Sequence, residues 1–329
     1  MKVLIVGSTG QLGFTIAQKL SQTSHQVLAF HRSSSDTSAL KKLPAITLVQ
    51  GDLLEPDTLK PALKDVDVVI STANAAVPSR KEDNFKNDVL GHRNLIQAAK
   101  EAGVKQFIFT SAISFGQFDR SIPLFRSKRQ TEADLAASGI PYTVFQPSNF
   151  MDIYFAFFGT ELPLQGVPVA SLKRPFKFMN SFFDGVRNDM KEKDTFDVIG
   201  KGDQPTSFIS VDNVADFHVQ AIDHPGAINR FVPIGGPEQL TALDVKAIFE
   251  EVYGKELKVK STPAAMIGLM SKVMSPFNIN AANILATQYA GTKIPGIVPN
   301  AQEAADEFGV QLTSAHAFLM EKAGRVELV

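Results

Sequence analysis

The first thirteen residues restrict the possible folds of this chain more than any other segment. Residues 3–6 are an unbroken apolar run, which predicts a strand buried on both faces of a parallel sheet. Glycines follow at a spacing of three, and residues 14–20 have the apolar periodicity of a helix. This order lets a pyrophosphate approach the helix N-terminus, although a ligand-free turn could use the same spacing. We therefore predict that a dinucleotide contacts Gly7, Ser8, Thr9, Gly10, Gln11 and Leu12.

The first half of the chain alternates apolar strand patterns with helical patterns. Strands are predicted at 27–30, 46–50, 66–70, 106–110 and 142–146, and helices at 84–102 and 128–138. Repeated strand–helix units of this length predict a parallel sheet with right-handed crossovers. We expect an α/β fold in which residues 1–150 form a doubly wound, Rossmann-type dinucleotide-binding domain.

Residues 151–329 have a less regular pattern and are expected to form a smaller C-terminal α/β substrate lobe. No linker-like stretch separates this part from the first, so we predict two interlocked lobes, with the second returning segments to the sheet of the first. Strands are predicted at 196–199, 208–211, 231–234 and 257–260, and helices at 213–222, 242–253, 263–275, 281–289 and 314–323.

The composition narrows the classes of function. The formal net charge is −1, the pI is about 6.6 and no basic block is present, which argues against nucleic-acid binding by charge. The chain has no cysteine, and its histidines lack the spacing of a metal site. No apolar run reaches the roughly 18 residues of a membrane span, and no signal-peptide pattern is present. We expect a cytoplasmic protein that binds no metal and is a monomer or a homodimer.

The residues after the second predicted strand indicate which dinucleotide is bound. An acidic residue there would hold the two ribose hydroxyls of NAD, but no carboxylate occurs before Asp36. Arg32 instead offers a guanidinium that can pair with a 2′-phosphate, and His31 and Ser33 could add donors. We therefore predict NADP(H), while an arginine exposed to solvent needs no partner at all.

Ligands of doubly wound sheets bind beyond the carboxyl ends of the strands, so the residues after the other strands are further candidates. Asp52 could accept from the adenine amine, and a role as a helix cap is an equal alternative. Small residues after the fourth strand would let the backbone pass close to the phosphates. The predicted contacts at these strand ends are Asp52, Leu53, Ser71, Thr72, Ala73, Asn74, Ser111, Pro147, Ser148, Asn149 and Phe150.

With these residues in view, the sequence resembles the NmrA-like, isoflavone-reductase-like branch of the atypical short-chain dehydrogenases/reductases. The similarity is carried by residues 7–13, 50–53 and 94–107, and by the Gly-Ile-Pro-Tyr-Thr run within 138–143. In the second half, residues 207–215 and 235–238 also resemble the family. The resemblance covers roughly the first 150 residues and a patch near 207–238, and it implies a superfamily rather than a substrate.

The same resemblance assigns a role to one lysine. Ordinary short-chain reductases use a Tyr-x-x-x-Lys pair; Lys128 has the lysine position, but Leu124 stands where the tyrosine would be. In isoflavone-reductase-like members a lone lysine lies eleven residues before the glycine of that run, as Lys128 does before Gly139. The resemblance implies a lysine near the nicotinamide that assists reduction of an activated double bond. The alternative, equally weighted, is that Lys128 only binds the nicotinamide ribose.

Aromatic residues near the fifth and sixth strands are candidates for the walls of an apolar pocket. Ordinary core packing is the alternative for each of them. The predicted substrate contacts are Phe115, Phe150, Tyr154 and Phe155, with Phe157 and Phe158 as further candidates.

These observations favour an NADPH-dependent oxidoreductase that transfers hydride to a small, hydrophobic conjugated substrate such as an enone or a quinone. In this hypothesis the hydride comes from the cofactor and the protein supplies orientation and electrostatics. Because Leu124 cannot transfer a proton, a second hypothesis stays open. It is a non-catalytic NADP(H)-binding protein, a redox sensor or an assembly or regulatory protein of the NmrA type.

Overall fold

A computed structural model describes residues 1–75, 80, 82–173 and 177–324 of the chain. Its main sheet has seven strands in the order β3-β2-β1-β4-β5-β6-β8, and each neighbouring pair is parallel. This order confirms the predicted doubly wound α/β fold. The strands are β1 (Lys2–Val6), β2 (Gln26–His31), β3 (Ile46–Gln50), β4 (Val68–Ser71), β5 (Gln106–Thr110), β6 (Tyr142–Pro147) and β8 (Arg230–Ile234).

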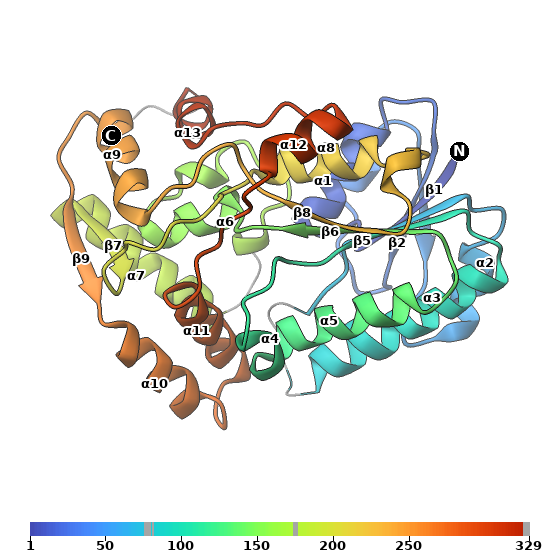
Figure 1. Ribbon diagram of the computed structural model, residues 1–329, viewed down its shortest axis with the longest axis horizontal. Helices are drawn as coiled ribbons and strands as arrows, with labels where there is room; N and C mark the ends of the chain where they lie inside the picture. The colour runs from blue at the N-terminus through green and yellow to red at the C-terminus, as the bar shows by residue number, and fades with distance from the viewer. Residues whose placement is uncertain (76–79, 81, 174–176, 325–329) are drawn as a thin grey trace.

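Helices cover both faces of this sheet (Figure 1). Alternate residues of β1 point to opposite faces, so Val3 and Ile5 join one core cluster and Leu4 and Val6 join the other. The first face packs against α1 (Gln11–Leu20), α8 (Val211–Gln220) and α12 (Ala301–Phe308), and the second against α2 (Leu59–Ala62), α3 (Gly91–Glu101) and α5 (Pro123–Ala136).

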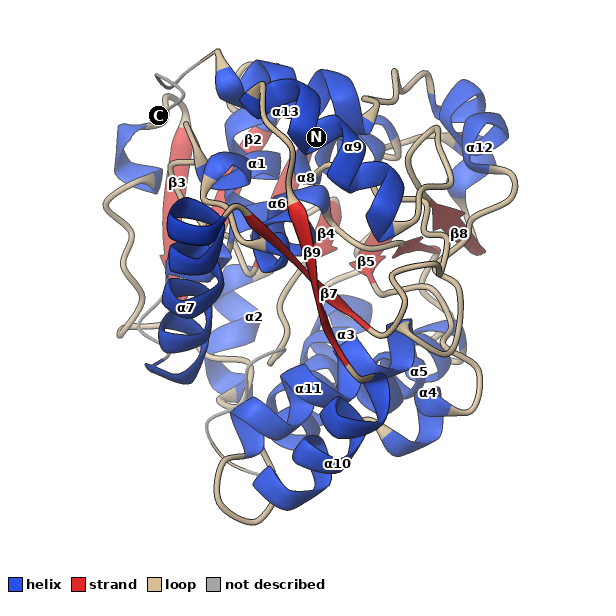
Figure 2. Cartoon of the chain, turned by 90° about the vertical axis from the view of Figure 1, so that its left-hand side faces the viewer, coloured by secondary structure: helices blue, strands red, loops and turns tan. Residues whose placement is uncertain are grey.

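The remaining elements gather beyond the carboxyl ends of the strands, around a separate pair of parallel strands, β7 (Thr195–Ile199) and β9 (Lys258–Thr262) (Figure 2). Phe155, Phe196 and Phe249 are fully buried in the core of this part. Its helices are α6 (Met151–Tyr154), α7 (Lys177–Lys193), α9 (Ala242–Tyr253), α10 (Ala264–Met274), α11 (Ile279–Gly291) and α13 (Ala315–Ala323). The second half of the chain also supplies β8, α8 and α12 to the first sheet and its covering layer.

Three sequence expectations about individual elements need correction. The strand expected at 208–211 does not form: Ile209 makes a single bridge with Phe150, and α8 begins at Val211 because the Ser210 hydroxyl caps the Asn213 amide at 3.0 Å. The helix expected from residue 128 begins at Pro123, a residue suited to a first helical position. The long helix expected from residue 84 starts as a π-helical segment, η3 (Asn84–Leu90), before it becomes α3.

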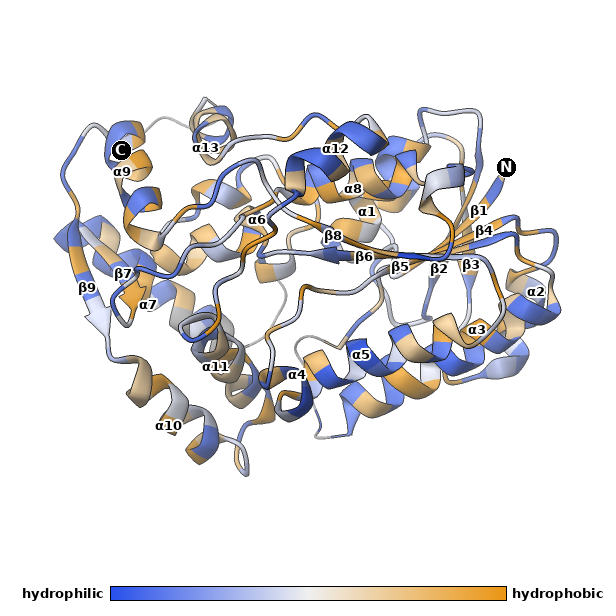
Figure 3. Ribbon diagram, in the orientation of Figure 1, coloured by the Kyte–Doolittle hydropathy of each residue, from blue (hydrophilic) through white to orange (hydrophobic). Residues whose placement is uncertain are grey.

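The hydropathy of the chain follows these layers: β1 is apolar, and helices α3 and α5 alternate apolar with polar residues (Figure 3). Among the residues that the structure describes, no helix is both long and apolar enough to cross a membrane.

Candidate functional site

The glycine turn after β1 leaves the start of α1 open to an anion. Gly7 has a φ of +88°, and the Gly10 amide donates to the Gly7 carbonyl at 2.9 Å, which closes the turn. Gly10 is the N-cap residue of α1, so no side chain caps this helix, and its first turn carries no acidic residue. The amides and the positive end of the helix dipole are therefore available for a phosphate.

Two of the glycines are required by close packing. A Cβ on Gly13 would lie 2.3 Å from the Gly7 carbonyl oxygen, so α1 approaches β1 closer than any side chain allows. A Cβ on Gly7 would lie 2.7 Å from both the Ala73 amide nitrogen and the Thr72 hydroxyl. The turn and the segment after β4 thus lie against each other, which places Thr72 and Ala73 beside the predicted phosphate site.

The end of β2 is tied to the same turn. The buried Ser8 hydroxyl donates to the Phe30 carbonyl at 2.9 Å, while Arg32 and Ser33 are exposed just beyond the strand. The His31 Nδ1 lies 3.0 Å from the Arg32 carbonyl oxygen. The structure therefore leaves Arg32 exposed just beyond the end of β2, and the Ser8 bond ties that strand end to the glycine turn.

Asp52 and Leu53 after β3 have local structural contacts. The Asp52 carboxylate accepts from the Leu54 amide at 2.9 Å, which is an Asx turn. The Leu53 carbonyl accepts from the Asn94 side chain at 2.9 Å, and Leu53 packs against Gly91. Asp52 is thus a turn residue, and its predicted contact with adenine stays a prediction.

Gln11 and Asp152 connect the turn to the second half of the chain. The Gln11 amide nitrogen lies 3.2 Å from Asp152 Oδ1, and its oxygen accepts from the Ser171 amide at 3.0 Å. Asp152 Oδ2 accepts from the Val211 amide at 2.8 Å. Burial raises the pKa of Asp152 to about 6. The Gln11 side chain therefore braces the site, a role that the motif did not reveal.

A buried histidine lies behind β4. His92 Nδ1 lies 2.8 Å from the Asp88 carbonyl oxygen, which only accepts, so Nδ1 carries the proton. Nε2 then accepts from the Ser71 hydroxyl at 2.9 Å. Burial lowers the pKa of His92 to about 4 and keeps the ring neutral. Ser71, one of the predicted cofactor contacts, thus donates its hydroxyl hydrogen to His92.

Lys128 lies at the carboxyl end of β5. Its Nζ donates to the Thr110 carbonyl at 2.6 Å and lies 4.7 Å from the centroid of the Phe109 ring, and the side chain is 5% exposed. Burial lowers the pKa of Lys128 to about 8, although the charges of Asp88 and Glu132 oppose this shift. Near neutral pH the site therefore holds a buried ammonium group with further N–H donors.

Asp88 is a partner of this site that sequence reasoning missed. Its carboxylate accepts from the Ala75 amide at 2.6 Å, from Asn84 at 3.1 Å and from the Ser127 hydroxyl at 3.3 Å. Burial raises the pKa of Asp88. The signal was the spacing of Asn84, Asp88 and His92 at every fourth position, which places three polar residues on one face of a buried helix.

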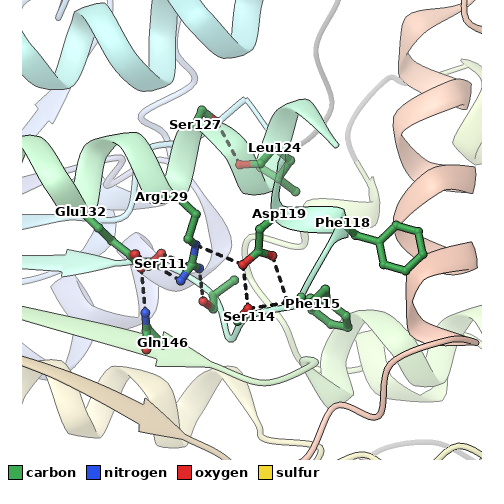
Figure 4. A network of polar contacts seen from close by, with 12 residues as sticks. Ser111, Ser114, Phe115, Phe118, Asp119, Leu124, Ser127, Arg129, Glu132 and Gln146 are labelled. Atoms are coloured by element: carbon green, nitrogen blue, oxygen red, sulfur yellow. Dashed lines mark hydrogen bonds and ion pairs between the residues drawn. The ribbon is translucent and has the colours of Figure 1, made fainter. Parts of the chain in front are cut away.

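A network of charges holds the loop between β5 and α5 (Figure 4). Arg129 Nη2 lies 3.3 Å from the Ser111 hydroxyl and also donates to the Ala112 carbonyl, while Nη1 lies 3.1 Å from Glu132. Asp119 accepts from the Ser114 hydroxyl at 2.7 Å and from the Phe115 amide at 2.9 Å. Ser111, a predicted neighbour of the nicotinamide, is therefore held by α5 (Figure 4).

A cavity of about 440 Å³ lies between β7, α10, α11 and the segment after β6. Of the predicted residues, Asn149, Tyr154, Phe157 and Phe158 line it. Burial raises the pKa of Tyr154 to about 12, so its phenol keeps its proton. The cavity begins where β6 ends, at the edge of the sheet that also carries the glycine turn.

Other predicted aromatic and strand-end residues lie elsewhere. Phe115 is buried and stacks on Phe125, with centroids 4.9 Å apart. Phe155 is fully buried between Phe208 and Phe249. Both are packing residues rather than cavity walls, because each is buried among the residues of its own hydrophobic cluster.

Phe150 and its neighbours make the transition from β6 to α6. Phe150 packs against the core on the α1 face. The Ser148 hydroxyl donates to the Gly296 carbonyl at 2.8 Å, and Pro147 is the last residue of β6. The Asn74 side chain donates to the Thr72 carbonyl at 3.2 Å. These contacts shape the backbone at the strand ends.

Asp197 on β7 is a cavity residue that the sequence analysis did not single out. One carboxylate oxygen lies 3.4 Å from the Lys260 ammonium, while Oδ2 is buried with no hydrogen-bond partner among the described residues. Burial raises the pKa of Asp197. A buried acceptor without a partner is costly unless a ligand supplies a donor. Within the described ranges, no cluster of His, Asp or Glu side chains is suited to hold a metal ion.

Known proteins share this fold and sequence pattern. The photosystem II assembly factor Ycf39 of Synechocystis sp. is 26% identical over 99% of this chain and 92% of its own length. The phenylcoumaran benzylic ether reductase Betv6 of Betula pendula is 28% identical over 88% of this chain and 85% of its own. The NADPH complex of the NADPH-dependent quinone oxidoreductase QOR2 of Escherichia coli has a TM-score of 0.70 at 22% identity, covering 97% of this chain and 99% of that one.

The family assignment follows from the sequence match. Residues 1–308 match the NmrA-like family, and this range includes the glycine turn, the Lys128 site and all the residues that line the cavity. This confirms the resemblance that the motifs predicted. The chain belongs to the NmrA-like family.

Proposed function

We propose that this protein is an NADPH-dependent oxidoreductase that transfers hydride to a hydrophobic conjugated acceptor, such as a quinone or an enone. The observation that carries the proposal is the cavity lined by Tyr154, Phe157 and Phe158, which starts at Asn149 beyond the end of β6. In doubly wound sheets the ligand lies at this edge. A largely apolar cavity there, with aromatic side chains in its wall, is suited to a planar apolar acceptor.

The residues of this chain fit NADPH. The uncapped N-terminus of α1 would bind the pyrophosphate, and the close approach of Gly7 to Ala73 leaves only backbone and small side chains beside it. Arg32 would bind the 2′-phosphate, since no carboxylate follows β2 before Asp36. When bound, the cofactor would supply the hydride.

Lys128 would act on the nicotinamide end of the site. Its ammonium is anchored by the Thr110 carbonyl, and its remaining N–H groups would donate to the ribose hydroxyls or to the acceptor. A pKa of about 8 also suits a group that gives up a proton near neutral pH. Both roles of Lys128 predict lower activity when the ammonium is removed.

Two cavity residues would orient the acceptor. The Tyr154 phenol, whose pKa is about 12, stays protonated and would donate a hydrogen bond to a carbonyl oxygen as it gains negative charge. Asp197 Oδ2 would accept from a hydroxyl or amine of the substrate. The cavity therefore favours an acceptor with one carbonyl oxygen and one donor group on an apolar frame.

The test is NADPH oxidation by the purified protein against a panel of quinones, enones and imines. We expect turnover with at least one quinone or enone, and a loss of about tenfold or more in kcat/KM for Tyr154→Phe, the cost of one hydrogen bond to developing charge. Tyr289→Phe is the matched control, because Tyr289 packs against Gly268. NADPH binding without turnover on any acceptor would contradict the proposal that the protein is a reductase.

The second candidate is a non-catalytic NADPH-binding assembly or regulatory protein. The similarity to an assembly factor over 99% of the chain favours it. In that case bound NADPH would change the affinity for a protein partner instead of being oxidised. Micromolar NADPH binding, no turnover on the panel and unchanged binding in Tyr154→Phe would together favour this candidate.

A further inference from the structure

Helix α10 presents a continuous apolar stripe to solvent. Met266, Leu269, Met270 and Val273 follow one another at helical spacing, and Phe277 continues the stripe in the turn after the helix. Leu269 is 62% exposed, Val273 is 56% exposed and Phe277 is 83% exposed. Exposed apolar residues are ordinary when scattered, but a stripe of four on one helix that continues with Phe277 in the following turn marks an interaction surface.

The opposite side of α10 is also apolar. The exposed stripe is therefore not explained by a helix that has a single apolar side and turns it to solvent instead of to the core. Ile267 and Gly268 are its buried residues, and Gly268 allows contact with the Tyr289 ring of α11, which a Cβ would approach to 3.0 Å. A helix with apolar residues on two opposite sides is ordinarily covered on both of them. In Figures 1 and 2, α10 lies at the edge of the molecule, outside α11.

The sequence segment that contains the stripe carries only positive charges, although Lys260 on β9 is ion-paired with Asp189 and Asp197 of other elements. Between Glu256 and Glu303 the sequence has no Asp or Glu, although the whole chain has 34 of them. The same stretch has four lysines, Lys258, Lys260, Lys272 and Lys293. Lys272 is exposed and lies within the stripe segment, between Leu269 and Val273. Apolar side chains next to Lys272, with no carboxylate in the stripe segment itself, complement a surface that is both apolar and anionic.

We infer that the stripe of Met266, Leu269, Met270, Val273 and Phe277 docks this protein on an anionic lipid bilayer. The helix lies in the interface, with the stripe among the acyl chains and Lys272 at the phosphate headgroups. This is peripheral docking by one helix face, and it requires no membrane-spanning segment.

Charge argues for a bilayer over a second copy of this chain. A symmetric pair of α10 helices would bring Lys272 of each copy towards the other, and the stripe segment has no carboxylate to pair with it. An anionic lipid surface supplies the missing negative charge, and its acyl region accepts a single protruding helix without a preformed groove.

Docking has a consequence for the cavity. Ala264 and Ile267 of α10 and Ile284 and Leu285 of α11 line it, so the bilayer would lie beside the cavity walls. A lipophilic ligand could then pass between membrane and cavity without crossing water. The docking itself rests on the stripe and its charge, and it holds whether the protein is a reductase or an assembly factor.

The test is flotation of the purified full-length protein with vesicles of phosphatidylcholine alone or of phosphatidylcholine mixed with phosphatidylglycerol. We expect binding to the mixed vesicles that weakens as salt is added. The double variant Leu269→Gln with Phe277→Gln should bind about tenfold or more weakly, because it removes two large apolar anchors. Lys272→Glu should bind the mixed vesicles about tenfold more weakly, and its binding to vesicles of phosphatidylcholine alone should be unchanged.

Matched controls separate docking from general surface effects. Leu243→Gln with Met320→Gln changes two apolar residues on α9 and α13 that are 42% and 46% exposed, and Lys60→Glu makes the same charge change on α2. These controls should bind like the unchanged protein. Failure of the unchanged protein to bind mixed vesicles overturns the inference, as does equal binding by the stripe variant. A dimer in sedimentation equilibrium that the stripe variant abolishes, without vesicle binding, would assign the stripe to self-association instead.

Discussion

The Lys128 ammonium donates to the Thr110 carbonyl at 2.6 Å, while the Thr110 hydroxyl lies 2.8 Å from His218 Nε2. His218 Nδ1 lies 2.7 Å from the Val214 carbonyl oxygen, so Nε2 must accept from Thr110. Burial lowers the pKa of His218 to about 4, which keeps the ring neutral. Thr110 thus connects α5 and α8 across the end of β5, and this connection holds the lysine in place.

The first prediction concerns the pH dependence of the Lys128 site. Because the pKa of Lys128 is about 8, its ammonium is lost as the pH rises through 8, and NADPH affinity should fall above that pH. Lys128→Met should weaken binding about tenfold and make it independent of pH in this range, as measured by fluorescence titration. An unchanged pH profile in Lys128→Met would assign the titration to another group.

The same shift affects stability in the opposite direction. Unfolding returns the pKa of Lys128 from about 8 to 10.5, so between these values the unfolded state binds more protons. The contribution of Lys128 to the free energy of unfolding should therefore rise with pH between 8 and 10.5. Denaturant titrations of the unchanged protein and Lys128→Met across this range measure the difference.

Asp152 should make the protein less stable as the pH rises from 3.8 to about 6. Burial raises this pKa from 3.8 to about 6, so the folded state binds more protons between these values. Ionisation should then cost up to about 3 kcal/mol, at about 1.4 kcal/mol per pKa unit. Relative to the unchanged protein, Asp152→Asn should gain stability from pH 3.8 to pH 6, and exposed Asp57→Asn should not. A parallel pH dependence for both variants would contradict the assignment.

Arg32 should discriminate between the two nicotinamide dinucleotides. Its exposed guanidinium lies just after β2, where a 2′-phosphate is predicted, and a charged hydrogen bond is worth about 1.5–3 kcal/mol. In calorimetric titrations, Arg32→Ala should weaken the binding of NADPH about tenfold or more and leave the binding of NADH nearly unchanged. Arg120→Ala, which removes an exposed arginine from α4 (Phe118–Ser121), is the control. Equal losses of affinity for NADPH and NADH in Arg32→Ala would contradict the assignment of Arg32 to the 2′-phosphate.

Gly13→Ala should destabilise the fold. The new Cβ would lie 2.3 Å from the Gly7 carbonyl oxygen, a backbone atom that can move only with β1, so we expect a loss of about 1–3 kcal/mol. Gly185→Ala is the matched control, because Gly185 is an exposed helical residue of α7 with open space around it. The control should gain about 0.5–1 kcal/mol, since alanine favours a helix. Thermal melting of both variants checks the pair.

Local sequence patterns predicted correctly the strands that are short apolar runs bounded by turn residues. The strands at 46–50 and 106–110 have the predicted bounds, because each is a compact apolar run between turn residues. The segment 208–211 has an equally apolar pattern, yet it makes only one bridge. Its apolar residues are buried by distant neighbours, and the Ser210 cap starts a helix at once. Burial alone therefore does not tell a strand from a loop in the core.

The phenylalanines show the same limit for the site. Tyr154 and Phe155 are adjacent, but only Tyr154 lines the cavity, because neighbouring positions of a helical turn face different directions. Asp197 lines the cavity from a strand that is distant in sequence. The sequence contained each of these residues, and no local pattern told which of them faces the open space.

The sequence by itself determined the parallel sheet, the glycine turn and the family, because these depend on patterns among residues close to one another in the chain. The tertiary structure decided that Asp88 lies near Lys128, that Gln11 braces Asp152, and that Phe115 and Phe155 pack in cores while Asp197 faces the cavity. Contacts between residues far apart in the chain arise only when the packed layers bring them together, and short-range periodicity carries no information about that distance.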